Sequence, residues 1–171
     1  MKSKVRIPGF LVPLPIHGAA VQSERGALVF LGPSEMGKST VSRLLEPLPV
    51  LADDGLYMMC AADGSWGAAA GDVRAFSGPL SAPEAAALRP VPLRGIFRLF
   101  RAEEPRLMRL EALELCRYLT HALFDLCWPL QCSLEAKKRA FADLAGIARA
   151  VPGYRLYFDR SPRTVEILSN V

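Results

Sequence analysis

The stretch VFLGPSEMGKSTVSRLL, residues 29–45, decides the fold of this chain. A short apolar run leads into Gly32, and Gly37, Lys38 and Ser39 open a segment with apolar side chains at steps of three and four. The spacing is that of the phosphate-binding sequence G-x-x-x-x-G-K-[ST], which needs a strand before the loop and a helix after it. The periodicity on either side predicts both elements.

The loop is the predicted nucleotide site. Its backbone N–H groups and the positive end of the following helix would hold the phosphates, Lys38 would reach the terminal ones, and Ser39 would bind Mg²⁺. The predicted ligands are therefore ATP and Mg²⁺. The predicted nucleotide-binding residues are Gly32, Pro33, Ser34, Glu35, Met36, Gly37, Lys38, Ser39 and Thr40.

Asp53 and Asp54 are a second pair of residues that could take part in catalysis. They directly follow the short apolar stretch LPVLA. We expect that stretch to be a parallel strand beside the loop strand, which would bring both carboxylates to the phosphates. One carboxylate can hold the metal, and the other can accept the proton of an attacking hydroxyl. The alternative is a solvated Asp-Asp-Gly turn.

The remaining sequence predicts a single domain over residues 1–171. Residues 71–92 are rich in Pro, Gly, Ala and Ser and are expected to be an exposed, partly irregular loop, whereas 110–151 is expected to be helical. The predicted strands are 9–22, 26–31, 48–52, a hairpin over 56–70 around Asp63-Gly64, 93–100, 154–158 and 164–168, and the predicted helices are 38–46, 110–126 and 133–151.

Composition narrows the class of protein. The formal net charge is +4, with Lys and Arg scattered along the chain, and no nucleic-acid recognition motif accompanies it. Pro8, Pro13 and Pro15 interrupt the apolar N-terminal region, and no apolar run approaches the ~20 residues of a membrane span. We therefore expect a cytoplasmic protein that binds neither nucleic acid nor membrane. The four cysteines have no CxxC spacing and are predicted to be free thiols.

Four motifs together resemble the C-terminal kinase domain of HPr kinase/phosphorylase. They are HGAAV at 17–21, GPSEMGKST at 32–40, LADDGLYM at 51–58 and PLRGIF at 92–97. The likeness extends to the short HPr-kinase-related proteins, whose nucleotide-binding architecture is shared with the ATP-dependent phosphoenolpyruvate carboxykinases. The resemblance implies an α/β fold, with a P-loop mixed sheet and flanking helices, and it leaves a homo-oligomer open.

The resemblance also implies roles for individual residues. Asp53 aligns with the aspartate that acts as base, Asp54 with its neighbour in the metal and substrate network, and His17 with a histidine near the transferred phosphate. Arg94 would stabilise charge on the phosphoryl group or bind the acceptor. The bland alternatives are a strand-edge imidazole for His17 and a surface arginine for Arg94. The expected catalytic residues are Asp53, Lys38, His17 and Arg94, and the expected metal ligands are Ser39, Asp53 and Asp54.

This sequence departs from the family pattern at two places. Pro92 stands where the signature has a glutamate that helps with metal, and Glu35-Met36 stand where many members have Gly and a small residue. The leading expectation is an ATP-dependent kinase that transfers the γ-phosphoryl group to a serine hydroxyl of a peptide, protein or small molecule. The alternatives are a catalytically weakened nucleotide-binding regulatory or scaffold protein, and a simple NTPase or carboxykinase-like enzyme.

Overall fold

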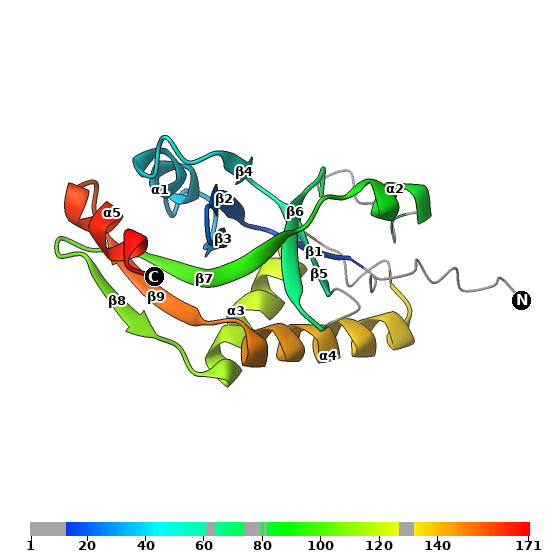
Figure 1. Ribbon diagram of the computed structural model, residues 1–171. Coiled ribbons are helices and arrows are strands. Elements are labelled where there is room, and N and C mark those ends of the chain that lie inside the picture. The colour runs from blue at the N-terminus through cyan, green and yellow to red at the C-terminus, as the bar shows by residue number, and fades with distance from the viewer. Residues whose placement is uncertain (1–12, 61–63, 74–79, 81, 127–131) are drawn as a thin grey trace, which may run out of the picture.

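The chain forms a mixed sheet with helices on both of its faces, as a computed structural model shows (Figure 1). The structure describes residues 13–60, 64–73, 80, 82–126 and 132–171. The strands of this part are β1 (Leu14–Ile16), β2 (Ala19–Ser23), β3 (Gly26–Leu31), β4 (Val50–Ala52), β5 (Leu56–Cys60), β6 (Trp66–Ala70), β7 (Val91–Arg101), β8 (Arg106–Arg109) and β9 (Gly153–Phe158). Its helices are α1 (Lys38–Leu44), α2 (Ala82–Ala87), α3 (Ala112–Phe124), α4 (Leu134–Ala150) and α5 (Pro162–Ser169). The predicted α/β class, a mixed sheet with flanking helices, is confirmed.

The long strand β7 organises the sheet. The strand order is β1-β5-β6-β7-β3-β2-β4, with β9 pairing with both β7 and β8. β7 runs parallel to β3 and to β9 and antiparallel to β6. The loop that follows β3 therefore leaves the sheet at the carboxyl edge of parallel strands, which is where α/β proteins commonly bind ligands.

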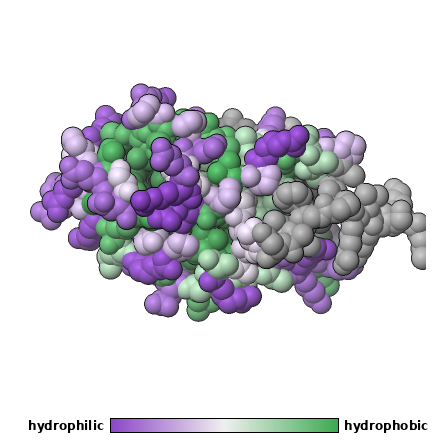
Figure 2. Space-filling model, in the orientation of Figure 1, coloured by the Kyte–Doolittle hydropathy of each residue, from purple (hydrophilic) through white to green (hydrophobic). Residues whose placement is uncertain are grey.

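Two cores lie on opposite faces of the sheet. Helices α3 and α4 cover one face, and α1 and α5 cover the other (Figure 1). The first core includes Ile96, Leu115, Leu119, Leu144 and Ile147, and the second includes Phe30, Val41, Phe97, Leu99 and Leu168. Seen from the same side, hydrophilic residues cover much of the surface around α5, β8 and β9, with apolar residues between them (Figure 2). The layered packing holds the loop after β3 between two buried cores.

Several predicted elements are confirmed. β2 and β3 form the expected hairpin, with Ser23 opposite Gly26, and the Ser23 hydroxyl donates to the Gly26 carbonyl over 2.7 Å. β5 and β6 pair antiparallel as the second hairpin. Gly64 has φ +84°, while Asp63 lies outside the described residues. Helices α1, α3 and α4 lie within the predicted ranges 38–46, 110–126 and 133–151.

The prediction of a closing strand over 164–168 is wrong, because these residues belong to helix α5. Its β-branched residues suggested a strand, but Pro162 occupies the first turn, where a fixed φ favours a helix. The Asp159 carboxylate accepts bonds from the Ser161 amide at 2.8 Å and from the Thr164 hydroxyl at 3.0 Å. These bonds at the start of the helix and the burial of Leu168 outweigh local β propensity.

The predicted strand over 9–22 is also wrong as a single element. In the described part of that range the chain forms two strands, β1 and β2, with His17 and Gly18 between them. The His17 amide donates to the Ala122 carbonyl of α3 over 3.0 Å, so it leaves the strand pairing. The break turns His17 toward the end of α3.

The described part of the region 71–92 has more regular structure than predicted. It contains α2 and the beginning of β7, and Val73 and Ala85 are buried. The strand β8, which pairs antiparallel with β9, was not predicted. Its charged sequence, RLMR, lacks the apolar pattern of a core strand.

The expected arrangement of the strand before the aspartate pair needs correction. β4 is not the neighbour of β3, since it pairs antiparallel with β2. Because β2 is itself antiparallel to β3, β4 points in the same direction as β3 with one strand between them. Asp53 and Asp54 still leave the sheet at the edge from which the loop emerges.

Two further expectations bear on the class of protein. Cys60, Cys116 and Cys132 are thiols that form no disulfide, as predicted, and Cys127 lies outside the described residues. Over the part of the chain that the structure describes, none of the helices combines the length and the apolar character needed to cross a bilayer.

Candidate functional site

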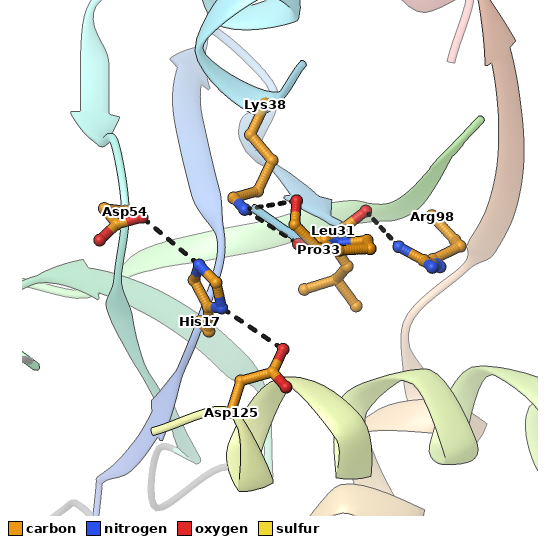
Figure 3. A network of polar contacts seen from close by, with 8 residues as sticks. His17, Leu31, Pro33, Lys38, Asp54, Arg98 and Asp125 are labelled. Carbon is orange, nitrogen blue, oxygen red and sulfur yellow. Dashed lines mark hydrogen bonds and ion pairs between the residues drawn. The ribbon is translucent and has the colours of Figure 1, made fainter. Parts of the chain in front are cut away.

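The loop after β3 closes around the amino group of Lys38. The Lys38 side chain is only 6% exposed, and its Nζ donates to the carbonyl oxygens of Gly32, at 2.9 Å, and Pro33, at 3.2 Å. Figure 3 shows the side chain reaching down from α1 to these carbonyls. The cation that would meet phosphate is thus held inside the turn of the loop.

The backbone of the loop takes conformations that favour glycine. Gly37 has φ +108°, and a Cβ there would lie 2.7 Å from Cζ of Phe158. Glu35 has φ +67°, a left-handed conformation that is unfavourable for a residue with a side chain. Arg101 donates to the Glu35 carbonyl over 2.6 Å, which holds this conformation. The glutamate therefore occupies the position where glycine would be relaxed.

The other loop residues predicted to bind nucleotide lie at the surface or close to it. Pro33, Ser34 and Glu35 are exposed, and Met36, Ser39 and Thr40 are half-buried. Gly37 is the N-cap of α1 and supplies no side-chain cap. The first N–H groups of a helix have no intrahelical acceptor. Those of this turn can therefore donate hydrogen bonds to an anionic ligand.

Four charged side chains act on the Lys38 ammonium group. Its pKa is lowered, mainly because burial disfavours the charged form, and Arg98 adds to this effect. The carboxylates of Asp54, Asp125 and Asp53 act in the opposite direction, in that order of strength. The structure therefore gathers three acidic residues and a second cation around the loop lysine.

His17 lies between two of these carboxylates. Its Nε2 is 3.4 Å from Oδ1 of Asp54, and its Nδ1 is 3.4 Å from Oδ2 of Asp125. The imidazole is 12% exposed, and the two carboxylates are 41% and 49% exposed. Figure 3 shows the three side chains in a row beside Lys38. A proton bound by either carboxylate can be shared through the ring.

Asp53, which was expected to be the base, is exposed and is the weakest of the three carboxylates in its effect on Lys38. His17 contacts its neighbour Asp54 instead. Among the described residues, no group of three or more His, Cys, Asp or Glu side chains is arranged so that it could hold a metal ion. The predicted metal ligands Ser39, Asp53 and Asp54 offer only oxygen atoms, the donor type that Mg²⁺ prefers.

The structure does not bring Arg94 to the loop. Leu93 pairs with Ala27 and Gly95 with Leu28, so Arg94 is the extra residue of a bulge, and a bulge redirects side chains. Arg94 Nη2 donates to the Val171 carbonyl, and Val171 packs on the core beneath α1 and α5. Pro92 pairs with Gly67 of β6, before the bulge and away from the carboxyl edge.

Arg98 lies where Arg94 was expected. It pairs with Leu31, the last residue of β3, and its Nη1 approaches the Leu31 carbonyl at 3.5 Å (Figure 3). Burial lowers its pKa. A single arginine inside the apolar stretch IFRLF was a signal that could have identified Arg98.

Asp125 is the second functional residue that sequence reasoning missed. It is the C-cap of α3, where the helix dipole disfavours a negative charge. Its position therefore does not stabilise the helix and instead places a carboxylate beside His17. An acidic residue directly after an amphipathic helix was the available signal.

Two cavities adjoin this row of side chains. One, of about 260 Å³, is lined by Leu31, Gly32, Pro33, Arg98, Tyr118, His121, Ala122 and Asp125. The other, of about 290 Å³, is lined by Leu51, Ala52, Asp53, Asp54, Gly55, Ala70, Gly71, Asp72 and Val73. Asp125 belongs to the first and Asp54 to the second, so His17 connects the two.

The chain was compared with known proteins. A family model described as SynChlorMet cassette protein ScmC matches residues 9–170. No curated protein matches. Among solved structures, the Hpr(Ser) kinase/phosphatase from Coxiella burnetii is similar in overall fold, with 11% identity and a TM-score of 0.47 over 91% of this chain and 94% of that chain. The family model that matches is thus ScmC and not one of HPr kinases.

Proposed function

We propose that this chain, which belongs to the SynChlorMet cassette protein ScmC family, binds ATP and transfers its γ-phosphoryl group to a hydroxyl. The observation that carries the proposal is the Lys38 ammonium group, buried and bonded to the Gly32 and Pro33 carbonyls within a G-x-x-x-x-G-K-S loop. A buried cation is costly unless it is paired. The triphosphate supplies the missing negative charge.

The nucleotide phosphates bind to the loop from Gly32 to Thr40. Amides at the start of α1 donate to phosphate oxygens, and Lys38 exchanges its loop carbonyls for the terminal phosphates. Glu35 is exposed, so its carboxylate turns toward solvent and leaves the phosphate side of the loop to backbone groups. The Arg101 bond to the Glu35 carbonyl holds this turn of the loop.

The donor set fits Mg²⁺. The Ser39 hydroxyl and the Asp53 carboxylate are hard oxygen ligands, and Mg²⁺ bound to a nucleotide needs few protein ligands because phosphates and waters fill the rest. When bound, the ion neutralises charge on the transferring phosphoryl group. Asp53 is assigned this role because it is the carboxylate that does not contact His17.

The acceptor hydroxyl is deprotonated by the row Asp54, His17 and Asp125. Its oxygen forms a bond to the γ-phosphorus, the bond from that phosphorus to the bridging oxygen breaks, and ADP leaves with the electron pair. The hydroxyl proton passes to a carboxylate of the row, where the imidazole holds it between Asp54 and Asp125. The acceptor class is a serine-type hydroxyl on a peptide, protein or small molecule.

Two observations favour the alternative of a nucleotide-binding regulatory or scaffold protein. Arg94 is bonded to Val171, away from the loop, and Pro92 replaces a glutamate that the HPr kinase pattern assigns to metal binding. A protein of this kind would bind nucleotide at the Lys38 loop but would not transfer the phosphoryl group. The two functions differ in whether product forms.

Transfer is tested by incubating the protein with MgATP and a library of serine-containing peptides and small hydroxyl compounds, and following phosphorus by NMR. A kinase gives a phosphorylated product that disappears in Asp54→Asn, while MgATP still binds. Binding without product from any acceptor supports the scaffold. Free phosphate released at the same rate with and without acceptors supports an NTPase.

A further inference from the structure

The cavity on the α3 side of the loop has no role in nucleotide binding as described above. It touches the loop only at Gly32 and Pro33. Helix α1, whose first amides face the phosphates, packs on the opposite core. The cavity therefore opens beside the phosphate site, in the layer of α3, and can hold a second ligand.

The volume of the cavity limits that ligand. At about 260 Å³ it is slightly smaller than typical small-molecule sites, which span roughly 300–1,000 Å³. It accommodates a small metabolite or one residue of a chain. A folded protein surface would contact the cavity only through such a residue.

Arg98 gives the cavity a cation that Asp125 influences electrostatically but that no carboxylate of the described residues contacts directly. In the described residues no carboxylate lies within ion-pair distance of its guanidinium, and its buried Nε has no hydrogen-bond partner. Its only hydrogen bond there is the long contact of 3.5 Å to Leu31. An unpaired, partly buried guanidinium is costly, so a bound anion would complete the site.

Two aromatic rings fix the orientation of that guanidinium. Its carbon lies 5.3 Å from the ring centre of Phe100 and 5.2 Å from that of Tyr118. Rings at these distances hold a guanidinium by cation–π attraction. A planar, oriented guanidinium matches the two oxygens of a carboxylate.

Asp125 lines the same cavity and contacts His17 at 3.4 Å. The cavity thus has a cation from β7 and a carboxylate of the proton-accepting row from α3. The Asp125 charge disfavours a doubly charged phosphate more than a singly charged carboxylate. A ligand with both a carboxylate and a hydroxyl satisfies both residues.

We propose that this cavity binds the phosphoryl acceptor by a carboxylate group, which Arg98 holds while the acceptor hydroxyl faces Asp125. The inference rests on the proposed function in that it names the acceptor of that reaction. The carboxylate belongs either to a free hydroxy or amino acid or to the C-terminal residue of a peptide. Both present a hydroxyl and a carboxylate a few bonds apart.

The test measures binding of L-serine, D-glycerate, the peptide Ala-Ala-Ser and its C-terminal amide by ligand-detected NMR, without nucleotide. We expect saturable binding of at least one free carboxylate below about 20 mM, weakened at least about tenfold in Arg98→Gln. The amide should not bind. A free acid that binds while Ala-Ala-Ser does not identifies a small molecule, and the reverse identifies a peptide end.

Matched variants separate the site from general effects. Arg94→Gln removes an arginine from the same strand on the other face and should leave acid binding unchanged. His121→Trp, at an exposed position of α3 that lines the cavity, should block acid binding with Arg98 intact, which covers the case in which Arg98→Gln does not fold.

Three results overturn the inference: no acid binds wild-type protein, Arg98→Gln and His121→Trp bind acid like wild type, or Arg98→Gln loses MgATP affinity while acid binding is unchanged. MgATP binding is measured in parallel on the wild-type protein. Acid binding without MgATP binding would refute the proposed transfer function and leave the carboxylate site standing.

Discussion

The Nδ1 atom of His17 lies 3.4 Å from Oδ2 of Asp125, although the two residues are 108 positions apart in the sequence. The bond from the His17 amide to Ala122 fixes this approach by tying the β1–β2 junction to the last turn of α3. Together with Asp54 on the other side of the ring, the pair forms the row that we propose as the base for the acceptor hydroxyl.

If this row is the base, its members differ in effect. Asp54→Asn should lower the transfer rate about 100-fold, within the range for loss of a general base. Asp125→Asn should lower it about tenfold, because the ring keeps Asp54 as one partner. The rates are measured by phosphorus NMR with the acceptor that wild-type protein phosphorylates. Glu111→Gln, an exposed acid at the other end of α3, is the control, and a rate for Asp54→Asn within threefold of wild type would remove the base assignment.

The strained loop residue predicts a stabilising substitution. Glu35→Gly should raise the melting temperature by about 2–4 °C, since relief of a left-handed conformation is worth about 1 kcal/mol. Ser34→Gly at the adjacent exposed position should lower it slightly, because glycine there only adds freedom to the unfolded chain. Equal changes in the two variants, measured by calorimetry, would show that the Glu35 backbone is not strained.

Gly37 and Gly64 separate backbone strain from steric conflict. Both have positive φ, but a Cβ on Gly37 would meet Phe158 at 2.7 Å, whereas among the described residues no atom lies within 4 Å of a Cβ on Gly64. Gly64→Ala should cost about 1 kcal/mol of unfolding free energy, and Gly37→Ala about 3 kcal/mol, because overpacking adds to strain. Urea denaturation measures both, and a Gly37→Ala cost no greater than that of Gly64→Ala would contradict the packing of Phe158 on the loop.

The buried Lys38 predicts a pH dependence of stability. Burial lowers its pKa below the ordinary value of 10.5, so between the two values the unfolded chain binds more protons and stability rises with pH. At lower pH Lys38 is protonated in both the folded and the unfolded state, so the folded state carries the full free-energy cost of burying the charged ammonium group. Lys38→Met removes this cost, so its melting temperature relative to that of wild type should be highest near neutral pH.

The difference in melting temperature between Lys38→Met and wild type should narrow as the pH is raised toward 10. Melting is followed by circular dichroism across this range, without nucleotide. A difference that stays constant with pH would mean that burial does not shift the Lys38 pKa.

The sequence predicted the parts of the site that are encoded locally. The loop, its strand and its helix are adjacent in the chain, so spacing and apolar periodicity were enough to identify them. The order of the motifs indicated that His17 and the aspartate pair lie near the same loop. It did not indicate which of the two carboxylates, Asp53 or Asp54, turns toward the imidazole ring. That orientation is set by β4 pairing with β2, which local patterns do not reveal.

The remaining residues of the site depend on long-range structure. Arg98 replaces Arg94 beside the loop because a bulge in β7 redirects the side chains of the strand, and one added residue is invisible in the alternation of LRGIFRLF. Asp125 reaches His17 only through the docking of α3. Helix α5 was mistaken for a strand because Pro162 in its first turn and the Asp159 bonds to Ser161 and Thr164 outweigh the β propensity of TVEIL.

The central claim is that the Lys38 loop binds a nucleoside triphosphate, and titration of MgATP into the protein by calorimetry tests it most directly. We predict saturable binding to wild type with a dissociation constant between about 1 μM and 1 mM, weakened at least about tenfold in Lys38→Met. Binding that is absent in wild type, or equally strong in folded Lys38→Met, would contradict the account.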